Sequence, residues 1–255
     1  MKKINVKKAV MLAILYTVVA AIAVSTTVAY LTGRDAKVNV FTFGQVKIEQ
    51  IELQRIKNTR ALSEYGLEEF TDGKELYPAV YDSIRWAAEP QKWPTGGSST
   101  LFSDDIQNVI DKFVFVENTR KNDAYVRSWF AFEAGSLSFE RFDELMHVNI
   151  NDTHWTWSDW NETPVNIDGV DYYVICATYT GTDTVHTGGI LPVGETTRPS
   201  LLQLFFDNAA DMAEIEIMGD DYKVIAASQA VQTAGFKDVE SAFAASFGDA
   251  HPFTK

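Results

Sequence analysis

The 255-residue chain contains little cysteine, little histidine and few basic residues for its number of acidic ones. Its single cysteine, Cys176, cannot form an internal disulfide, so no disulfide framework holds the fold. Cys176 lies in the apolar stretch YYVICATYT, which predicts a small buried side chain. A catalytic thiol would need a neighbouring base, and this stretch contains none.

The four histidines do not form an H-E-x-x-H pair, so the usual zinc-protease helix is absent. Glu144 and His147 would share one face of a helix, but a di-iron site needs two such pairs and two further glutamates. No phosphate-binding glycine loop, nucleophile elbow or calcium-binding helix-loop-helix pattern occurs. The sequence therefore predicts a protein that is not an enzyme, with no cofactor beyond loose calcium binding by loops such as MGDDYK at 218–223.

Acidic residues outnumber basic ones, 35 to 22, for a formal net charge of −13. Residues 1–29 hold four lysines and no acidic residue, so a chain without them would carry −17. Such a surface repels nucleic acid and anionic membranes, which excludes nucleic acid as an expected partner. It also makes self-association sensitive to salt, pH and cations.

The chain begins with the basic segment MKKINVKK, followed by an uncharged apolar run at residues 9–29. Thr27-Val28-Ala29 has the small residues of a signal peptidase site, so we predict cleavage between Ala29 and Tyr30. The expected product is a secreted protein at the cell surface or in the extracellular matrix. As a helix the run would span about 31 Å, enough to cross a bilayer core of about 30 Å. An uncleaved membrane anchor therefore stays open as an alternative.

The full chain is 46% hydrophobic and 13% aromatic, a composition that indicates a globular protein. Residues 37–53 alternate apolar and polar side chains, which predicts one long strand with Gly44 as a bulge where the alternation changes phase. The pattern at residues 60–70 predicts a helix, and the composition of residues 86–100 predicts a loop.

The second half of the chain carries clearer local signals. Residues 108–133 read as strand, turn and strand, and residues 138–148 as a short helix with Ser138 as its N-cap. Asp168-Gly169 predicts a type I′ hairpin, and Gly248 the end of a C-terminal helix. Strands follow at irregular spacing with no βαβ alternation, which predicts a mainly β, antiparallel sandwich. Trp155, Trp157 and Trp160 could form a carbohydrate-stacking patch, but packing in the sandwich is favoured.

Four segments of the mature chain resemble, in order, the family of secreted biofilm-matrix fibre proteins typified by TasA and camelysin (CalY). They are AYLTGRDAKVNVFTFGQVKI, VENTRKNDAYVRSW, LPVGETT and SQAVQTAGF. The first is similar to the family's Asn-x-Phe-Thr-x-Gly-x-Val pattern and the second to its Asn-Thr…Ala-Tyr-Val-Arg strand. The last is similar to the Gln-Ala-x-Gly-Phe motif near the end of the family's sequences. The family-motif positions are Asn39, Phe41, Thr42, Gly44, Val46, Asn118, Tyr125, Val126, Arg127, Gly194, Glu195, Gln232, Gly235 and Phe236.

The resemblance implies a jelly-roll-like sandwich over residues 30–255, export through a SipW-type signal peptidase, and assembly of copies of the chain into extracellular fibres. Residues 56–105 match nothing in the family and are predicted to be an insertion. Two alternatives remain: a camelysin-like secreted metallopeptidase, for which no zinc motif is present, and a membrane-anchored surface adhesin.

A fibre needs a way for copies to join, and an extended N-terminal segment can pair with the sheet edge of a neighbour. Head-to-tail pairing of this kind does not close, so it grows a filament. We hypothesise that residues from Tyr30 to about Leu53 act as this donor strand. The assembly residues would be Val40, Phe41, Phe43, Val46 and Ile48. In the simpler alternative the segment is the first strand of its own sandwich.

Overall fold

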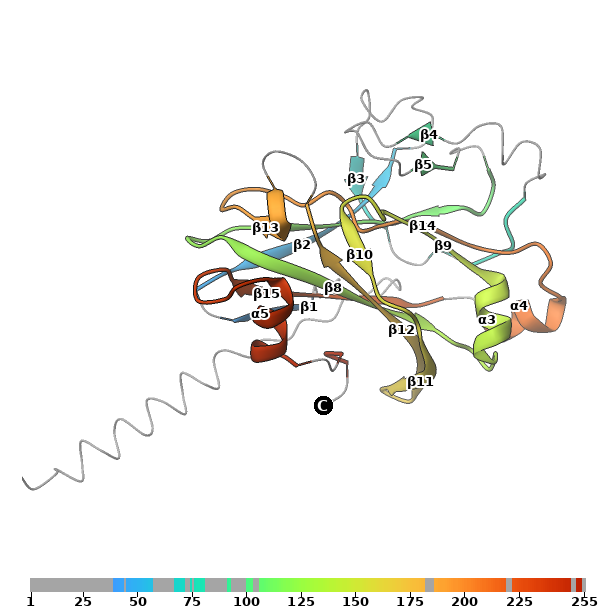
Figure 1. The fold of residues 1–255 in the computed structure, drawn as a ribbon. Coiled ribbons are helices and arrows are strands. Elements are labelled where there is room, and N and C mark those ends of the chain that lie inside the picture. The colour runs from blue at the N-terminus through green and yellow to red at the C-terminus, as the bar shows by residue number, and fades with distance from the viewer. Residues whose placement is uncertain are drawn as a thin grey trace, which may run out of the picture.

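The computed structural model describes residues 39–43, 45–56, 67–71, 74, 76–80, 91–92, 100–102, 106–181, 186–218, 222–248 and 251–253. Its strands form two facing layers, and its helices lie at the ends and on the outside (Figure 1). Among these residues, no helix is long and apolar enough to span a membrane. The predicted leader at residues 1–29 lies outside them.

The first layer is a sheet in the order β1-β15-β8-β12-β10, with β11 pairing β12 and β13 pairing β8. Its strands are β1 (Asn39–Phe43), β8 (Ala124–Glu133), β10 (Trp155–Trp157), β11 (Asn161–Ile167), β12 (Val170–Tyr179), β13 (Ile190–Leu191) and β15 (Val224–Gln232). All pairs in it are antiparallel except β1 with β15. Asp168 and Gly169 both have positive φ, at 51° and 90°, which confirms the predicted I′ turn between β11 and β12.

The second layer combines two three-stranded sheets, β3-β2-β7 and β6-β14-β9. Its strands are β2 (Ile48–Arg55), β3 (Leu67–Glu69), β6 (Ile110–Asp111), β7 (Phe113–Asn118), β9 (Met146–Ile150) and β14 (Leu201–Phe206). Backbone hydrogen bonds join the two sheets, from Ser200 N to Val114 O at 2.8 Å and from Thr197 N to Val116 O at 2.9 Å. A short pair, β4 (Gln91–Lys92) and β5 (Thr100–Leu101), completes the described strands.

The core lies between the layers because every second side chain of each strand points inward. Val126, Phe130 and Phe132 of β8 are fully buried in the same cluster as Val114 of β7 and Leu204 of β14. Burying each of these large apolar side chains stabilises the fold by about 1.5–3 kcal/mol. The predicted mainly β, antiparallel sandwich is confirmed.

The helices begin and end where local chemistry predicts. In α3 (Phe139–Leu145), the Ser138 side chain accepts a hydrogen bond from Arg141 N, which confirms the predicted N-cap. In α5 (Val239–Ser246), Asp238 and Ser241 form a capping box. Gly248, at φ 67°, donates its N–H to Phe243 O at 3.0 Å and ends the helix as predicted. A single 3-10 turn (η2, Thr187–Gly189) and α4 (Met212–Met218) complete the described helices.

Several sequence predictions in the first half are wrong. Residues 37–53 are not one strand, because β1 and β2 belong to opposite layers, and residues 45–47 precede β2 on the crossing between them. The change of phase marks this crossing; the predicted bulge residue, Gly44, lies outside the described residues. Residues 67–69 of the predicted helix form β3, and residues 91–92 of the predicted loop form β4.

Candidate functional site

Strand β1 forms the outer edge of the first layer (Figure 1). It pairs in parallel with β15, in register from Asn39 opposite Ala227 to Phe43 opposite Val231. Among the described strands, β15 is its only ladder partner. The side chains of β15 from Val224 to Val231 are buried. A five-residue edge strand therefore covers a buried strand and is held by hydrogen bonds on one side.

Within the predicted donor segment, β1 is the strand that lies at the edge of the first layer. Strand β2 pairs with β7 over residues 48–53 and with β3 over residues 53–55, so it belongs to the second layer. Val46 and Ile48 lie in the main core of their own chain, as the simpler alternative predicted. The cleavage residues Ala29 and Tyr30, and the side chains of Val40, Phe41 and Phe43, lie outside the described part of the structure.

Three family-motif positions that are far apart in sequence meet at the end of β7. Asn118, fully buried, donates from Nδ2 to Asn122 O at 2.9 Å and to Leu191 O at 3.0 Å. Its backbone N–H donates to Glu195 O at 3.0 Å, and Gly194 N donates to Asn118 O at 2.8 Å. Gly194 has φ 80°, a left-handed conformation that favours glycine. Asn118, Gly194 and Glu195 thus form one hydrogen-bonded corner.

The same end of the molecule holds the chain as it leaves β1. Gln45 N donates to Gln232 Oε1 at 3.2 Å, and Asn122 Nδ2 donates to Gln45 O at 3.4 Å. Thr119 N donates to Lys47 O at 2.9 Å. The crossing between the layers is therefore tied to the end of β15 and to the turn after β7. The role of Gln232 as an anchor for residue 45 could not be read from the sequence, because its partner is 187 positions away.

Motif positions on β8 attach α5 to the outer face of the first layer. The Arg127 side chain, buried on that face, donates from Nε to Gln229 Oε1 at 2.5 Å and from Nη2 to Gly248 O at 3.0 Å. Its guanidinium lies 4.6 Å from the ring centroid of Phe243, a cation–π distance. Tyr125 packs with Val231, Phe236 and the apolar face of α5, whereas Val126 points into the main core. These positions stabilise the sheet and the helix that covers it.

A chain of polar side chains runs through the interior between the layers, and we call it the polar seam. Its members are Ser128, Ser228, Gln50, Glu52 and Lys112. Ser128 Oγ and Ser228 Oγ lie 3.0 Å apart, and Ser228 Oγ donates to Gln50 Oε1 at 2.7 Å. Gln50 Nε2 donates to Glu52 Oε1 at 2.8 Å, and Glu52 forms an ion pair with the buried Lys112. All are paired, as buried polar groups must be to avoid a large desolvation cost.

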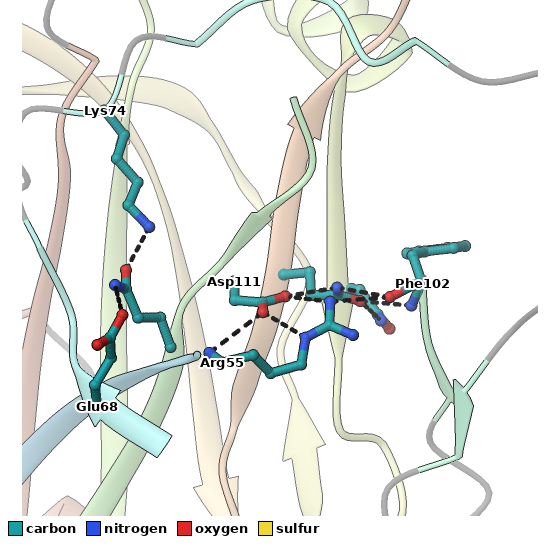
Figure 2. Close-up of polar contacts among 8 residues, drawn as sticks. Arg55, Glu68, Lys74, Phe102 and Asp111 are labelled. Carbon is teal, nitrogen blue, oxygen red and sulfur yellow. Dashed lines mark hydrogen bonds and ion pairs between the residues drawn. The ribbon is translucent and has the colours of Figure 1, made fainter. Parts of the chain in front are cut away.

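Beyond the polar seam, β2 ends at a polar cavity of about 750 Å³ in the second layer. Arg55 donates to Asp111 through two parallel hydrogen bonds, Nε to Oδ2 at 2.5 Å and Nη2 to Oδ1 at 2.8 Å (Figure 2). Gln54 Nε2 donates to Glu68 Oε1 at 2.8 Å, and Lys74 donates to Gln54 Oε1. Sequence analysis missed this cavity because β2, β3 and β6 contribute separate pieces of it.

Within the described residues, the chemical candidates Cys176 and His147 lie on different strands, β12 and β9. Burial raises the pKa of the Cys176 thiol to about 12, so it stays protonated. His147 lies on β9 after α3 has ended, so the predicted helix face shared with Glu144 is wrong; it contacts Asp207 at 2.8 Å instead. Within the described ranges, no group of three or more His, Cys, Asp or Glu side chains is placed to hold a metal. Residues 219–221 of the predicted calcium loop lie outside those ranges.

The three tryptophans pack against the sandwich, as favoured from the sequence. Trp155 is buried and donates from Nε1 to Arg198 O at 2.9 Å. Trp157 stacks on Phe130 with 5.5 Å between centroids, and Trp160 meets Phe132 edge-on at 5.3 Å. All three therefore contribute to the packing of the core.

Comparison with protein families, with characterised proteins and with solved structures finds no match. The resemblance to the TasA and camelysin family stays a prediction from sequence. The functional interpretation therefore depends on the β1 edge, the corner that ties it, and the cavity.

Proposed function

We propose that this chain is a secreted structural subunit that assembles into extracellular fibres by exchanging β1 between neighbouring copies. The observation that carries the proposal is the position of β1. It is the first described strand, it lies at a sheet edge, and it pairs with β15 alone among the described strands. The resemblance of four segments to secreted matrix-fibre proteins supports the same function.

Exchange would keep the contacts of β1 while joining two molecules. If β1 leaves its own chain, the edge of β15 from Ala227 to Val231 loses its hydrogen-bonding partner. The β1 strand of another copy has the same sequence and restores the same ladder. Because the donor strand and the acceptor edge are different parts of the surface, each joined copy still offers one of each, and the chain of copies continues to grow.

The corner around Asn118 sets where the exchanged segment ends. Residues 45–47 are held by Gln232, Asn122 and Thr119, so β1 can move while β2 stays in its layer. The net charge of −17 without residues 1–29 opposes association at low ionic strength, which would keep subunits apart until counter-ions screen them.

The proposal is tested by deleting residues 30–43 from the purified mature protein and imaging by electron microscopy. We expect a folded subunit, checked by circular dichroism, that forms no filaments. A synthetic peptide of residues 30–43, added in excess to intact subunits, should occupy acceptor edges and stop growth, whereas a scrambled peptide should not. Normal filaments from the truncated chain, or no effect of the peptide, would refute strand exchange. N-terminal sequencing of secreted material tests the cleavage after Ala29.

A further inference from the structure

The polar cavity at the end of β2 has the size of a binding site for a small molecule. Its volume of about 750 Å³ lies within the range of about 300–1,000 Å³ typical of ligand sites. It is lined from β2 by Gln54 and Arg55, from β3 by Glu68, and from the loops by Lys74, Tyr77 and Asn108. Three separate parts of the second layer thus converge on one hollow.

The walls of the cavity are fixed by buried hydrogen bonds. The Arg55 guanidinium is held by Asp111 and also donates from Nη2 to Phe102 O at 3.0 Å. Asp111 in turn accepts from Gln203 Nε2 at 2.8 Å, and Gln203 is fully buried. A site whose polar groups are already positioned loses little entropy when a ligand binds.

The charges on the described lining balance. Arg55 and Lys74 supply two cations, Glu68 and Asp111 supply two carboxylates, and the remaining polar side chains are three amides and two hydroxyls. An ionic ligand would meet no net opposite charge here. A neutral molecule with many hydroxyl groups suits the mixture, because each hydroxyl can donate to a carboxylate or amide oxygen and accept from an amide or ammonium N–H.

Tyr77 adds an aromatic surface to this polar lining. It lines the cavity and 46% of its surface is exposed, which is unusual among the aromatic side chains that the structure describes. A tyrosine side chain combines an apolar ring with a polar hydroxyl group. Sugar rings present the matching combination, an apolar C–H face and hydroxyl groups at the edge.

We propose that this cavity binds a neutral oligosaccharide, with Tyr77 against one sugar ring and Glu68, Lys74 and Asn108 contacting its hydroxyl groups. This goes beyond the proposed fibre role, because β1 belongs to the other layer and the cavity does not include it. A fibre of such subunits would carry one saccharide site per copy.

The test uses the purified mature chain and three neutral probes, maltotriose, cellotriose and N,N′,N″-triacetylchitotriose, by saturation-transfer NMR and calorimetry. We expect at least one to bind. Tyr77→Ala should weaken that binding by about tenfold through loss of the stacking surface. Glu68→Gln keeps an oxygen that can accept from Gln54 but removes a charged acceptor, and should weaken binding by about threefold or more.

Glu240→Gln is the matched control, because Glu240 is an exposed carboxylate beside a different, smaller cavity at Arg127. It should leave affinity unchanged. The proposal is overturned if no probe binds at millimolar concentration, or if Tyr77→Ala and Glu68→Gln both bind as the unaltered protein does. Selective binding of an anionic trimer such as tri-galacturonate would also overturn it. Filament formation is scored separately, so failure here leaves the strand-exchange proposal to its own test.

Discussion

Ser228 on β15 donates a hydrogen bond to Gln50 on β2, with 2.7 Å between Ser228 Oγ and Gln50 Oε1. The two residues are 178 positions apart and belong to opposite layers. Both are buried, so neither could lose the other without exposing an unpaired polar group to the apolar interior. Strand β15 is also the partner of β1. The bond therefore connects the strand on which β1 lies to β2, the next strand in the chain.

Replacing Ser228 with alanine should destabilise the fold. It leaves Gln50 Oε1 without its donor and Ser128 Oγ without its neighbour, which should lower the free energy of unfolding by about 1–3 kcal/mol. Urea denaturation measures the change. Ser136→Ala, at an exposed position, should stay within about 0.5 kcal/mol of the unaltered protein. Equal stability of the two variants would mean that the polar seam contributes nothing.

The features that sequence analysis predicted correctly depend on neighbouring residues. Asp168-Gly169 specifies its turn because both residues tolerate positive φ, and Ser138 starts α3 because its oxygen reaches the N–H of Arg141. The alternating strands 113–118 and 124–133 were also found, since one turn connects them. Local chemistry of this kind is visible in a window of about ten residues.

The missed features depend on partners that are distant in sequence. Gln50 continues the alternation of Val46 and Ile48, but the sequence gives no sign of Ser228, the partner across the core that accompanies its burial. Alternation also cannot distinguish a bulge from a crossing between layers, so residues 37–53 were read as one strand. One wall of the cavity is formed by Arg55 and Asp111, which are 56 positions apart, so no local pattern predicts it.

Asn118→Ala should loosen the corner that connects β7 to the loop after β13. Two donor bonds from the buried amide would be lost, to Asn122 O and Leu191 O, leaving both carbonyls short of a partner. We expect a loss of about 2–3 kcal/mol in the free energy of unfolding. Asn122→Ala removes only the longer 3.4 Å bond to Gln45 O and should cost less than about 1 kcal/mol. A reversed order would contradict the anchoring role of Asn118.

Cys176 should resist thiol reagents in the folded protein. Burial raises the pKa of its thiol from 9.0 to about 12, so at pH 8 almost no thiolate is present and the sulfur is covered. Reaction with 5,5′-dithiobis(2-nitrobenzoate) should be negligible natively and reach one thiol per chain in guanidinium. Rapid native labelling would contradict the buried position.

The raised pKa of Cys176 also makes the free energy of unfolding depend on pH. The folded state keeps the proton that the unfolded thiol releases, so this contribution to stability is complete below about pH 9 and is lost as pH rises towards 12. The free energy of unfolding should therefore fall over this range, and fall less steeply in Cys176→Ala. Parallel slopes for the two proteins would show that Cys176 titrates alike in both states.

Assembly should respond to screening of the acidic surface. A subunit without residues 1–29 carries a net charge of −17, and the repulsion between copies falls as the Debye length shortens from about 30 Å at 0.01 M salt to about 8 Å at 0.15 M. Light scattering should rise earlier with added NaCl, and earlier still with CaCl₂ or at mildly acidic pH. If the scattering curves are the same at all salt concentrations and pH values, charge repulsion does not control assembly.

A pair of cysteines at Thr42 and Ala230 would report directly on the exchange of β1. The two positions are opposite each other in the β1–β15 register, on strands about 4.8 Å apart, within the Cα separation that a disulfide spans. Oxidising dilute monomers of Thr42→Cys/Ala230→Cys should lock β1 to its own β15. We expect the locked subunits to form no filaments until a reductant opens the bond.

Filaments grown from the reduced double variant and oxidised afterwards should give the opposite linkage. Because β1 of one copy would then lie on β15 of the next, denaturing gels without reductant should show a ladder of disulfide-linked copies. Each single-cysteine variant should show monomers, since Cys176 is buried. If locked monomers assemble as fast as reduced ones, or if filaments contain only links within one chain, then β1 stays in its own sandwich and copies must join through another surface.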